Sequence, residues 1–167
     1  DEENRKVINC ICFDVTESKK NEFNLKYEND VLNLALRNTS MDVWKFDLAT
    51  KSITLLSEKS KNRYSTDKIE NVPSVFVEKQ YIHPDSLFPF LEMHEAIQRG
   101  EPYSEADVRI KDNFGRYRWC RVKYVMLYDE ETGSPVDAIG IGEDITDEKD
   151  IQLRTLMDLQ YKEAIIS

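Results

Sequence analysis

Ile141-Gly142-Glu143-Asp144-Ile145-Thr146-Asp147-Glu148-Lys149 leads a short apolar run through Asp-Ile-Thr into acidic residues and a long helical pattern. The stretch Ile11-Cys12-Phe13-Asp14-Val15-Thr16-Glu17-Ser18-Lys19 has the same arrangement, and its Asp lies 130 positions earlier in the chain. Thr is a favoured N-cap residue, and acidic residues in a first turn interact favourably with the helix dipole. Both stretches therefore predict a strand that runs directly into a helix, and their spacing indicates a tandem array of similar domains.

Between these two stretches, five segments alternate apolar and polar residues in the way that is typical of strands. Helical patterns occupy 17–37, the segment from His83 to Gly100, and 147–165, whereas 58–82 is mixed. Strands placed around a helical middle predict an α+β domain with one antiparallel sheet. The predicted strands are 42–47, 52–56, 103–111, 116–128 and 136–145.

Six motifs in consistent order give the segment from Leu34 to Lys149 a resemblance to the PAS domain, in the PAS-fold subgroup of bacterial sensory proteins. Asp144-Ile145-Thr146 is similar to the motif at which the family's last strand passes into the output helix, and we name these three residues the exit motif. Asp14-Val15-Thr16 is similar to the same motif, which implies the tail of a preceding PAS domain at the N-terminus. The other five motifs are Asp42-Val43-Trp44-Lys45-Phe46-Asp47, His83-Pro84-Asp85, Gly100-Glu101-Pro102-Tyr103, Asp112-Asn113-Phe114-Gly115-Arg116-Tyr117-Arg118-Trp119 and Gly133-Ser134-Pro135-Val136.

The resemblance implies a PAS fold, which is a five-stranded antiparallel sheet with short helices on one side and flanking N- and C-terminal linker helices. It divides the chain into four parts. These are the C-terminal strand of a preceding PAS-like domain at 1–16, a connector helix at 17–37, a PAS domain at 38–146 and a signalling helix at 147–167.

The resemblance also implies a sensory or regulatory domain of a multidomain bacterial signal-transduction protein. Such a domain relays ligand binding or a conformational change through its flanking helices to an output domain of the same chain. A diguanylate cyclase or a histidine kinase is the expected output, and family frequency favours the cyclase. Two alternatives stay open: a ligand-free dimerisation or spacer module in a tandem PAS array, and a small enzyme. We expect no catalytic residues here, because the chain has no Ser-His-Asp pattern, Gly-rich phosphate loop or metal motif.

Signal coupling is expected at the exit motif. We expect Thr146 to cap the output helix and Asp144 to form a hydrogen bond or ion pair, so that the last strand and the helix are joined. A cap of this kind stabilises a helix by about 1 kcal/mol. An interpretation in which Thr146 is only a structural cap is open as well. The complete set of expected coupling residues is Asp144, Thr146, Trp44 and Asp47.

The family places a ligand cavity between the inner face of the sheet and the helical middle. Apolar residues at strand and helix periods form a filled core by default, so a core without a ligand is the alternative. Gly140 and Gly142 alternate along the last strand, which allows close packing against one of its faces. The expected lining residues are Trp44, Phe46, Leu55, Phe76, Phe88, Leu91, Val108, Val122 and Ile141.

A homodimer is the expected assembly, because the last helix carries a partial apolar stripe near heptad positions. For the leading helix, two interpretations of Phe23, Tyr27 and Leu34 are open: contact in a dimer, or cover for the sheet of the same chain. The expected dimer residues of the last helix are Leu153, Leu156, Leu159 and Ile166.

The composition limits the partners. The formal net charge is −9, and an acidic surface repels phosphate backbones and anionic lipids, so we expect neither nucleic-acid nor direct membrane binding. The three cysteines, Cys10, Cys12 and Cys120, fit reduced thiols in the cytoplasm better than a disulfide framework. The parent protein can still be anchored in a membrane. Arg109, Arg116, Arg118 and Arg121 are expected to pair with acids on the outer face of the sheet.

No cofactor is expected, and whether the domain binds an unknown small-molecule ligand stays open. The chain has no counterpart of the Asn-Cys-Arg-Phe-Leu-Gln motif of the family's flavin-binding branch. His83 and His94 are its only histidines, so haem is not expected either. His83 lies in the helix-entry motif, where a turn or capping function is predicted, and His94 is placed on the helix surface. A structural zinc site usually needs four ligands, and the sequence offers no second cysteine pair, so no metal is expected.

Overall fold

The computed structural model describes residues 16–167, and the Asp14-Val15 part of the N-terminal echo, Cys10 and Cys12 lie outside the described residues. The chain divides into two compact units after Ala35. Within the described part, the first unit contains helix α1 (Thr16–Asn38), which continues by three residues into the second. The predicted helix at 17–37 is therefore confirmed as a helix.

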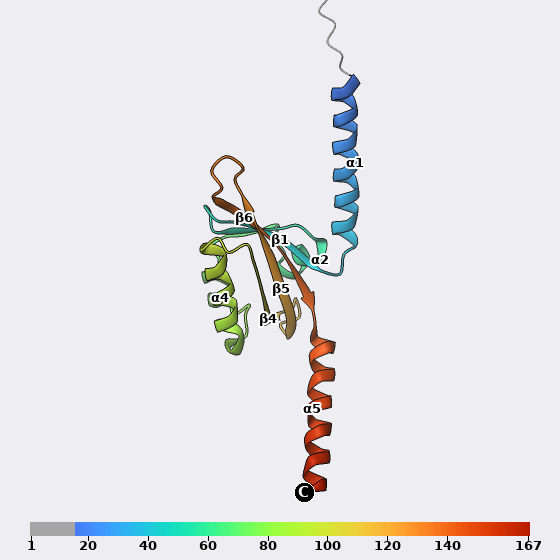
Figure 1. Cartoon of the computed structure of the whole chain (residues 1–167), viewed down its shortest axis with the longest axis vertical. Helices are drawn as coiled ribbons and strands as arrows, with labels where there is room; N and C mark the ends of the chain where they lie inside the picture. Colours follow the sequence, from blue (N-terminus) through green and yellow to red (C-terminus); the bar gives the residue numbers. More distant parts are fainter. Residues whose placement is uncertain (1–15) are drawn as a thin grey trace, which may run out of the picture. The chain divides into compact units, whose positions relative to one another are not determined.

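The second unit contains one sheet of six antiparallel strands in the order β3-β2-β1-β6-β5-β4 (Figure 1). Five of the strands match the predicted strands to within one residue at either end. The strands are β1 (Asp42–Asp47), β2 (Ser52–Leu55), β3 (Lys68–Ile69), β4 (Tyr103–Lys111), β5 (Tyr117–Tyr128) and β6 (Pro135–Asp144).

The prediction of five strands was wrong by one, because the short strand β3 pairs with β2. Ile69 lies opposite Ile53, and Lys68 lies opposite Thr54. Two residues are too few to produce a visible alternation of apolar and polar positions, so the irregular segment 58–82 gave no sign of it.

Short helices cover one face of the sheet (Figure 1). The 3₁₀ turn that leads into the longest of them, α4, begins after His83, whose Nδ1 accepts a hydrogen bond from the backbone N–H of Asp85 at 3.1 Å. This confirms the capping function predicted for His83. The helix ends before Gly100, whose positive φ of 73° suits glycine. The helices of this layer are α2 (Glu58–Tyr64), α3 (Ser74–Glu78), the 3₁₀ turn η1 (Pro84–Ser86) and α4 (Leu87–Gln98).

The hydrophobic core lies between the sheet and these helices. Phe46, Val108 and Tyr124 are the largest fully buried apolar side chains of the sheet. Phe76 of α3 and Phe90 of α4 pack against each other over this face, with ring centroids 5.5 Å apart. The inner face of the sheet is therefore the wall on which any cavity of the domain must lie.

β6 occupies the middle of the sheet, between β1 and β5, and the last helix α5 (Thr146–Ile166) follows it after Ile145 (Figure 1). Asp42 of β1 lies opposite Gly142 of β6, and Asp144 of β6 lies opposite Cys120 of β5. The predicted strand-to-helix transition at the exit motif is confirmed. No helix within residues 16–167 is both long and apolar enough to cross a membrane.

Candidate functional site

A cavity of about 70 Å³ lies between the inner face of the sheet and the helices. Five of the residues predicted to line it do so. Trp44 and Phe46 come from β1, Leu55 from β2, Phe76 from α3 and Val122 from β5. The cavity and the filled core that the sequence left open are therefore both present, as a small space within a packed interior.

Two residues of α4 were assigned to the wrong face of the helix. The side chain of Phe88 is 78% exposed and that of Leu91 is 37% exposed, so neither lines the cavity. Phe90 and Met93 take their place. Because α4 is apolar on much of its circumference, its sequence is compatible with two apolar faces. Only the folded structure shows which of the two faces is buried.

Two strand residues on the predicted list do not line the cavity either. Val108 is fully buried, but it belongs to the packed core. Ile141 alternates with Gly140 and Gly142, and Gly142 lines the cavity, so Ile141 points to the other face of the sheet. The inner positions of β6 are small residues, which is why hydrophobicity pointed to the wrong face of this strand.

The glycines of β6 make room for larger neighbours on the cavity side. A Cβ atom at Gly140 would lie 2.0 Å from Cζ2 of Trp44, the residue opposite it on β1. A Cβ atom at Gly142 would lie 3.0 Å from Sγ of Cys120 and 3.4 Å from Cβ of Asp42. The close packing predicted from these glycines is therefore explained by the Trp44 indole and by a polar corner around Asp42.

The cavity is also lined by several polar side chains that the sequence did not reveal. His94 was placed on the helix surface, but it is buried, and its ring meets the ring of Phe46 edge to face at 5.3 Å. Burial lowers the pKa of His94, with a smaller contribution from the charge of Lys51. Asp42, Ser60, Tyr64 and the free thiol of Cys120 also line the cavity.

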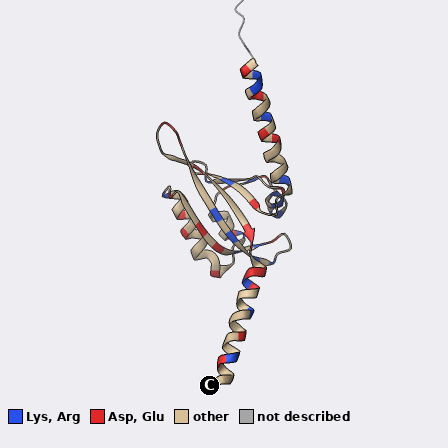
Figure 2. Cartoon of the chain, turned by 45° about the vertical axis from the view of Figure 1, so that its right-hand side comes forward, with Lys and Arg blue, Asp and Glu red and all other residues tan. Residues whose placement is uncertain are grey.

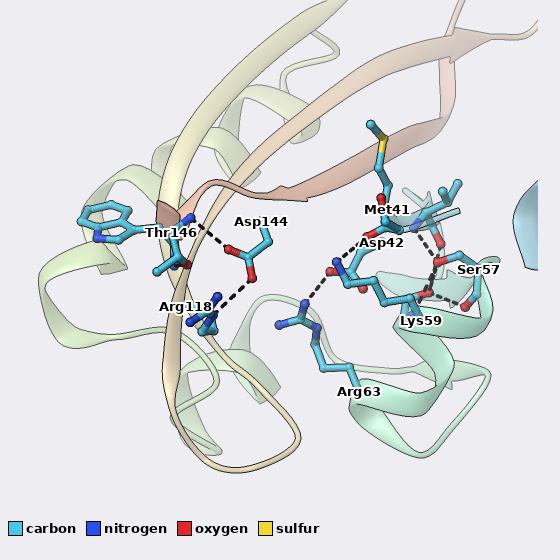
Figure 3. A network of polar contacts seen from close by, with 12 residues as sticks. Met41, Asp42, Ser57, Lys59, Arg63, Arg118, Asp144 and Thr146 are labelled. Atoms are coloured by element: carbon cyan, nitrogen blue, oxygen red, sulfur yellow. Dashed lines mark hydrogen bonds and ion pairs between the residues drawn. The ribbon is translucent and has the colours of Figure 1, made fainter. Parts of the chain in front are cut away.

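Asp42 forms a buried ion pair with Arg63 of α2 at this corner. Nη2 of Arg63 donates a hydrogen bond to Oδ2 of Asp42 at 2.7 Å, and the side chains are only 11% and 12% exposed (Figure 3). Burial raises the pKa of the Cys120 thiol to about 12, and the charge of Asp42 adds to this effect. The thiol is therefore protonated at neutral pH.

The exit motif lies close to this corner. Oδ1 of Asp144 accepts a hydrogen bond from the backbone N–H of Thr146 at 2.9 Å, and Oδ2 accepts one from Nε of Arg118 at 3.2 Å (Figure 3). Burial raises the pKa of Asp144, but the hydrogen bonds from Thr146 and Arg118 outweigh this and hold it below its usual value. One carboxylate thus contacts both the first turn of α5 and the neighbouring strand β5.

The capping function expected of Thr146 was wrong. Its hydroxyl accepts a hydrogen bond from the backbone N–H of Trp119 at 3.0 Å, and it caps no amide of α5. The N–H of Ile145 donates a hydrogen bond to the carbonyl of Trp119 at 2.9 Å, so the beginning of β5 is joined to the exit motif by two hydrogen bonds. The N-cap residue is Ile145, and the side chain that bonds the first amide of the helix is that of Asp144.

A second set of contacts joins α5 to the outer face of the sheet. Nζ of Lys149 lies 2.8 Å from Oδ2 of Asp107 and 5.2 Å from the centroid of the Trp119 ring. Arg121 bonds Asp107 at 2.9 Å and Glu148 at 3.2 Å. Burial raises the pKa of Asp107, but its bonds to Arg121 and Lys149 outweigh this and lower it. Figure 2 shows the acidic first turn of α5 at the point where the helix leaves the sheet.

The predicted pairing of the arginine cluster with acids is confirmed, but two of the acids, Asp85 in η1 and Asp112 in the β4–β5 turn, do not lie on the outer face of the sheet. Besides the pairs of Arg118 and Arg121, Arg109 lies 2.6 Å from Asp85 and Arg116 lies 3.3 Å from Asp112. These cations are therefore already engaged with acids of the same domain.

The structure separates the other two expected coupling residues from the exit motif. Asp47 lies at the far end of β1, where Oδ1 accepts a hydrogen bond from the N–H of Thr50 at 2.8 Å. Trp44 packs over Gly140, which places it beside the cavity. Asp47 therefore stabilises the β1–β2 turn. Trp44 lies opposite Gly140 and Asp47 opposite Asp137, so Trp44 is the nearer of the two to the exit motif along β6.

The dimer stripe of α5 is exposed along its length. Leu153, Leu156, Leu159 and Ile166 are 53%, 57%, 52% and 86% exposed. No residue of α5 is buried. Phe23, Tyr27 and Leu34 of α1 are exposed as well. No group of three or more metal-binding side chains occurs within the described part of the chain.

Comparisons with known proteins agree with the sheet described above. The family model described as PAS fold matches residues 72–142. A sensory box histidine kinase/response regulator from Burkholderia thailandensis E264 is similar in structure, with a TM-score of 0.60, 19% identity, and coverage of 78% of this chain and 96% of that chain. The N-terminal domain of a diguanylate cyclase with PAS/PAC sensor from Marinobacter aquaeolei has a TM-score of 0.54, 20% identity, and coverage of 66% and 99%.

A PAS domain of a protein from Colwellia psychrerythraea has a TM-score of 0.52 at 19% identity, with coverage of 74% of this chain and 98% of that chain. At these identities the likeness is one of fold. Among curated proteins, none has a significant sequence match.

Proposed function

The chain contains a PAS domain, and from this we propose that it is the sensory domain of a multidomain bacterial signal-transduction protein. It receives a ligand or a conformational change at the sheet and passes it through α5 to an output domain of the same chain. The similar structures from Burkholderia thailandensis and Marinobacter aquaeolei are named for a histidine kinase and a diguanylate cyclase, which supports an output of one of these two kinds. The domain itself carries out no catalysis.

The observation that carries this proposal is the double attachment of the exit motif. Asp144 bonds Thr146 of α5 and Arg118 of β5, while Thr146 bonds Trp119 of β5. A displacement of β5 or β6 must therefore break these hydrogen bonds or move the first turn of α5 with it.

The energies involved suit a switch. A hydrogen bond of this kind contributes about 1 kcal/mol to stability, and bonds to a charged group contribute about 1.5–3 kcal/mol. A change of 1.4 kcal/mol alters an equilibrium about tenfold. Loss or gain of one or two such bonds is enough to shift α5 between two arrangements.

We further propose that the output is read in a homodimer whose α5 helices associate in parallel. The supporting feature is the exposed apolar stripe of Leu153, Leu156 and Leu159, which a second copy of the same helix would bury. A rotation at the base of α5 would then change the packing along the dimer axis. The free, buried Cys120 supports a reducing compartment, and we place the domain in the cytoplasm.

The test is the output activity of the full-length parent protein with Thr146→Val or Asp144→Asn, with and without its stimulus. We expect both substitutions to change the basal output or the size of the response. Asp137→Asn is the matched control, because Asp137 lies on the same strand and its side chain forms, within residues 16–167, a single ion pair, with Lys45 at 3.4 Å. An unchanged response in both exit-motif variants would contradict the proposal and favour a spacer.

A further inference from the structure

Asp42, which lines the cavity, and its partner Arg63, which lines a second cleft, carry buried polar atoms that have no partner in the described residues. Asp42 is 8% exposed when the whole residue is counted, and within residues 16–167 its Oδ1 has no hydrogen-bond partner. Nε and Nη1 of Arg63 are likewise buried and without a partner in the described part of the chain. Three of the five such atoms in the described residues thus belong to this one ion pair. Buried polar groups are nearly always bonded, so the unbonded Oδ1 of Asp42, a side chain that lines the cavity, points to a ligand there.

Asp42 Oδ1 belongs to a side chain that lines the cavity, and much of the remaining wall is apolar. Phe46, Val122 and Ile97 are among its neighbours in the lining. A carboxylate oxygen in such a wall accepts a hydrogen bond and offers none. The wall therefore selects a ligand that carries a donor at one end and an apolar body behind it.

The charge of the ligand follows from the pair itself. Arg63 already neutralises Asp42 at 2.7 Å, so an ammonium group would enter a corner whose net charge is zero. Burial of a charge without its own counter-charge is costly, whereas a hydroxyl or N–H group loses little. A neutral donor is therefore favoured over a cation.

We propose that the cavity binds a small neutral molecule with a hydroxyl or N–H group at one end, and that this group donates a hydrogen bond to Oδ1 of Asp42. This inference rests on the proposed sensory function and names the ligand class of its site. The volume of about 70 Å³ sets the size. An apolar cavity of about 150 Å³ accommodates benzene, so a molecule of only a few heavy atoms fits without rearrangement.

The same ion pair connects the ligand to the exit motif. Asp42 lies opposite Gly142, two positions before Asp144. Arg63 lines a second cleft together with Arg118 and Asp144 (Figure 3). When the ligand donates a hydrogen bond to Asp42, the ion pair between Asp42 and Arg63 becomes weaker. The Arg63 guanidinium can then compete with Arg118 for Asp144. Asp42 is in this way a ligand-binding residue and Arg63 a positioning residue.

The experiment uses 2-propanol and acetone as probes, because they have the same heavy-atom skeleton and similar size and only 2-propanol donates a hydrogen bond. Binding to the chain is followed by NMR at the methyl groups of Met93 and Ile97, which line the cavity, and at Nε of Arg63 and Arg118. We expect saturable methyl shifts, an affinity for 2-propanol about tenfold higher than for acetone, and movement of both arginine signals with 2-propanol only. Equal affinity for the two probes would overturn the inference.

A double variant, Asp42→Leu with Arg63→Met, removes the acceptor without leaving a buried charge, and such replacements of buried pairs are often neutral for stability. We expect the preference for 2-propanol to disappear while the fold is retained. Asp137→Asn, on the outer face, should keep the preference. A preference that persists in the double variant overturns the inference about Asp42, but it leaves a ligand-binding sensory domain in place.

If neither probe gives saturable shifts, the inference on ligand class fails. The proposed function is then still decided separately, by the output of the exit-motif variants.

Discussion

The hydroxyl of Thr146, the first residue of α5, accepts a hydrogen bond from the backbone N–H of Trp119 in β5 at 3.0 Å. The bond gives the Trp119 N–H a partner just outside the β5–β6 ladder, which begins at the pair of Cys120 and Asp144. It also fixes where the helix begins relative to the sheet.

Thr146→Val removes this acceptor and keeps the shape of the side chain. We expect a loss of about 1 kcal/mol in the free energy of unfolding, because the Trp119 amide is left without its partner. The measurement is urea denaturation, together with hydrogen exchange of the first turn of α5, which should become faster. Thr155→Val is the control, since the exposed Thr155 hydroxyl bonds only its own helix at Ile151. Equal losses in the two variants would contradict this function of Thr146.

Asp144 predicts a defined dependence of stability on pH. Burial raises its pKa, but hydrogen bonds from Thr146 and Arg118 outweigh this and hold the pKa below the usual 3.8. A lowered pKa means that the folded state favours the charged form. The stabilisation is therefore complete above 3.8 and is lost as the pH falls through the lowered value.

Asp144→Asn should accordingly be less stable than the unmodified chain at about pH 7, and the difference should disappear at about pH 2. Urea unfolding at the two pH values is the measurement, with Asp137→Asn beside it. A difference of the same size at both pH values would show that the charge of Asp144 contributes nothing.

Gly140→Ala should disturb Trp44. The added Cβ would lie 2.0 Å from the indole, so the ring must move or the strands must separate, at a cost of about 1–3 kcal/mol. Tryptophan fluorescence should shift, since the chain has only two tryptophans. In a Trp44→Leu background the same substitution should cost much less, and a double-mutant cycle measures the coupling. Additive effects would rule out the contact as the cause.

Phe88 and Phe90 form a matched pair on one helix. Phe90 is 8% exposed and Phe88 is 78% exposed. We expect Phe90→Ala to lower the free energy of unfolding by about 3–5 kcal/mol. Phe88→Ala should change it by less than about 0.5 kcal/mol. Chemical denaturation of both variants checks the face of α4 directly, and the reverse order would show that the helix is rotated.

Leu156→Glu tests the dimer. The residue is 57% exposed in the single chain, so the substitution should leave the free energy of unfolding of the monomer nearly unchanged. Because it would place a charge in the proposed helix interface, we expect a chain that sediments as a dimer to become a monomer. Gln160→Glu is a control on the same helix. An unmodified chain that stays monomeric at high concentration would contradict the dimer.

Most of the sheet could be predicted because its strands are long and alternate regularly. In β4 and β5 every second residue faces the interior, and most of these residues are apolar. This alternation, together with the turn residues between the strands, was enough to predict both strands. The Asp-Ile-Thr sequence located the start of α5 to within one residue. The same patterns did not reveal β3, because its two residues are too few to show an alternation.

The cavity was harder to predict, because its walls depend on which face of an element is buried. β6 presents Ala138, Gly140 and Gly142 to the interior. Because Ile141 is bulkier and more hydrophobic than these residues, the sequence wrongly predicted that Ile141 lines the cavity. The buried pair of Asp42 and Arg63 joins strand β1 to the short helix α2, and no periodic pattern in the sequence connects these two positions. Polar residues that become buried through tertiary contacts are visible only once the fold is known.

The insertion of β6 between β1 and β5 has a consequence for synthesis of the protein. A nascent chain that has not yet passed residue 144 cannot complete its sheet, because the strand that joins the two halves is the last to be made. Until then β1 and β5 each have an unpaired edge, which is a liability for mispairing with other chains. Folding of the domain on the ribosome must therefore wait until the exit motif has left the tunnel.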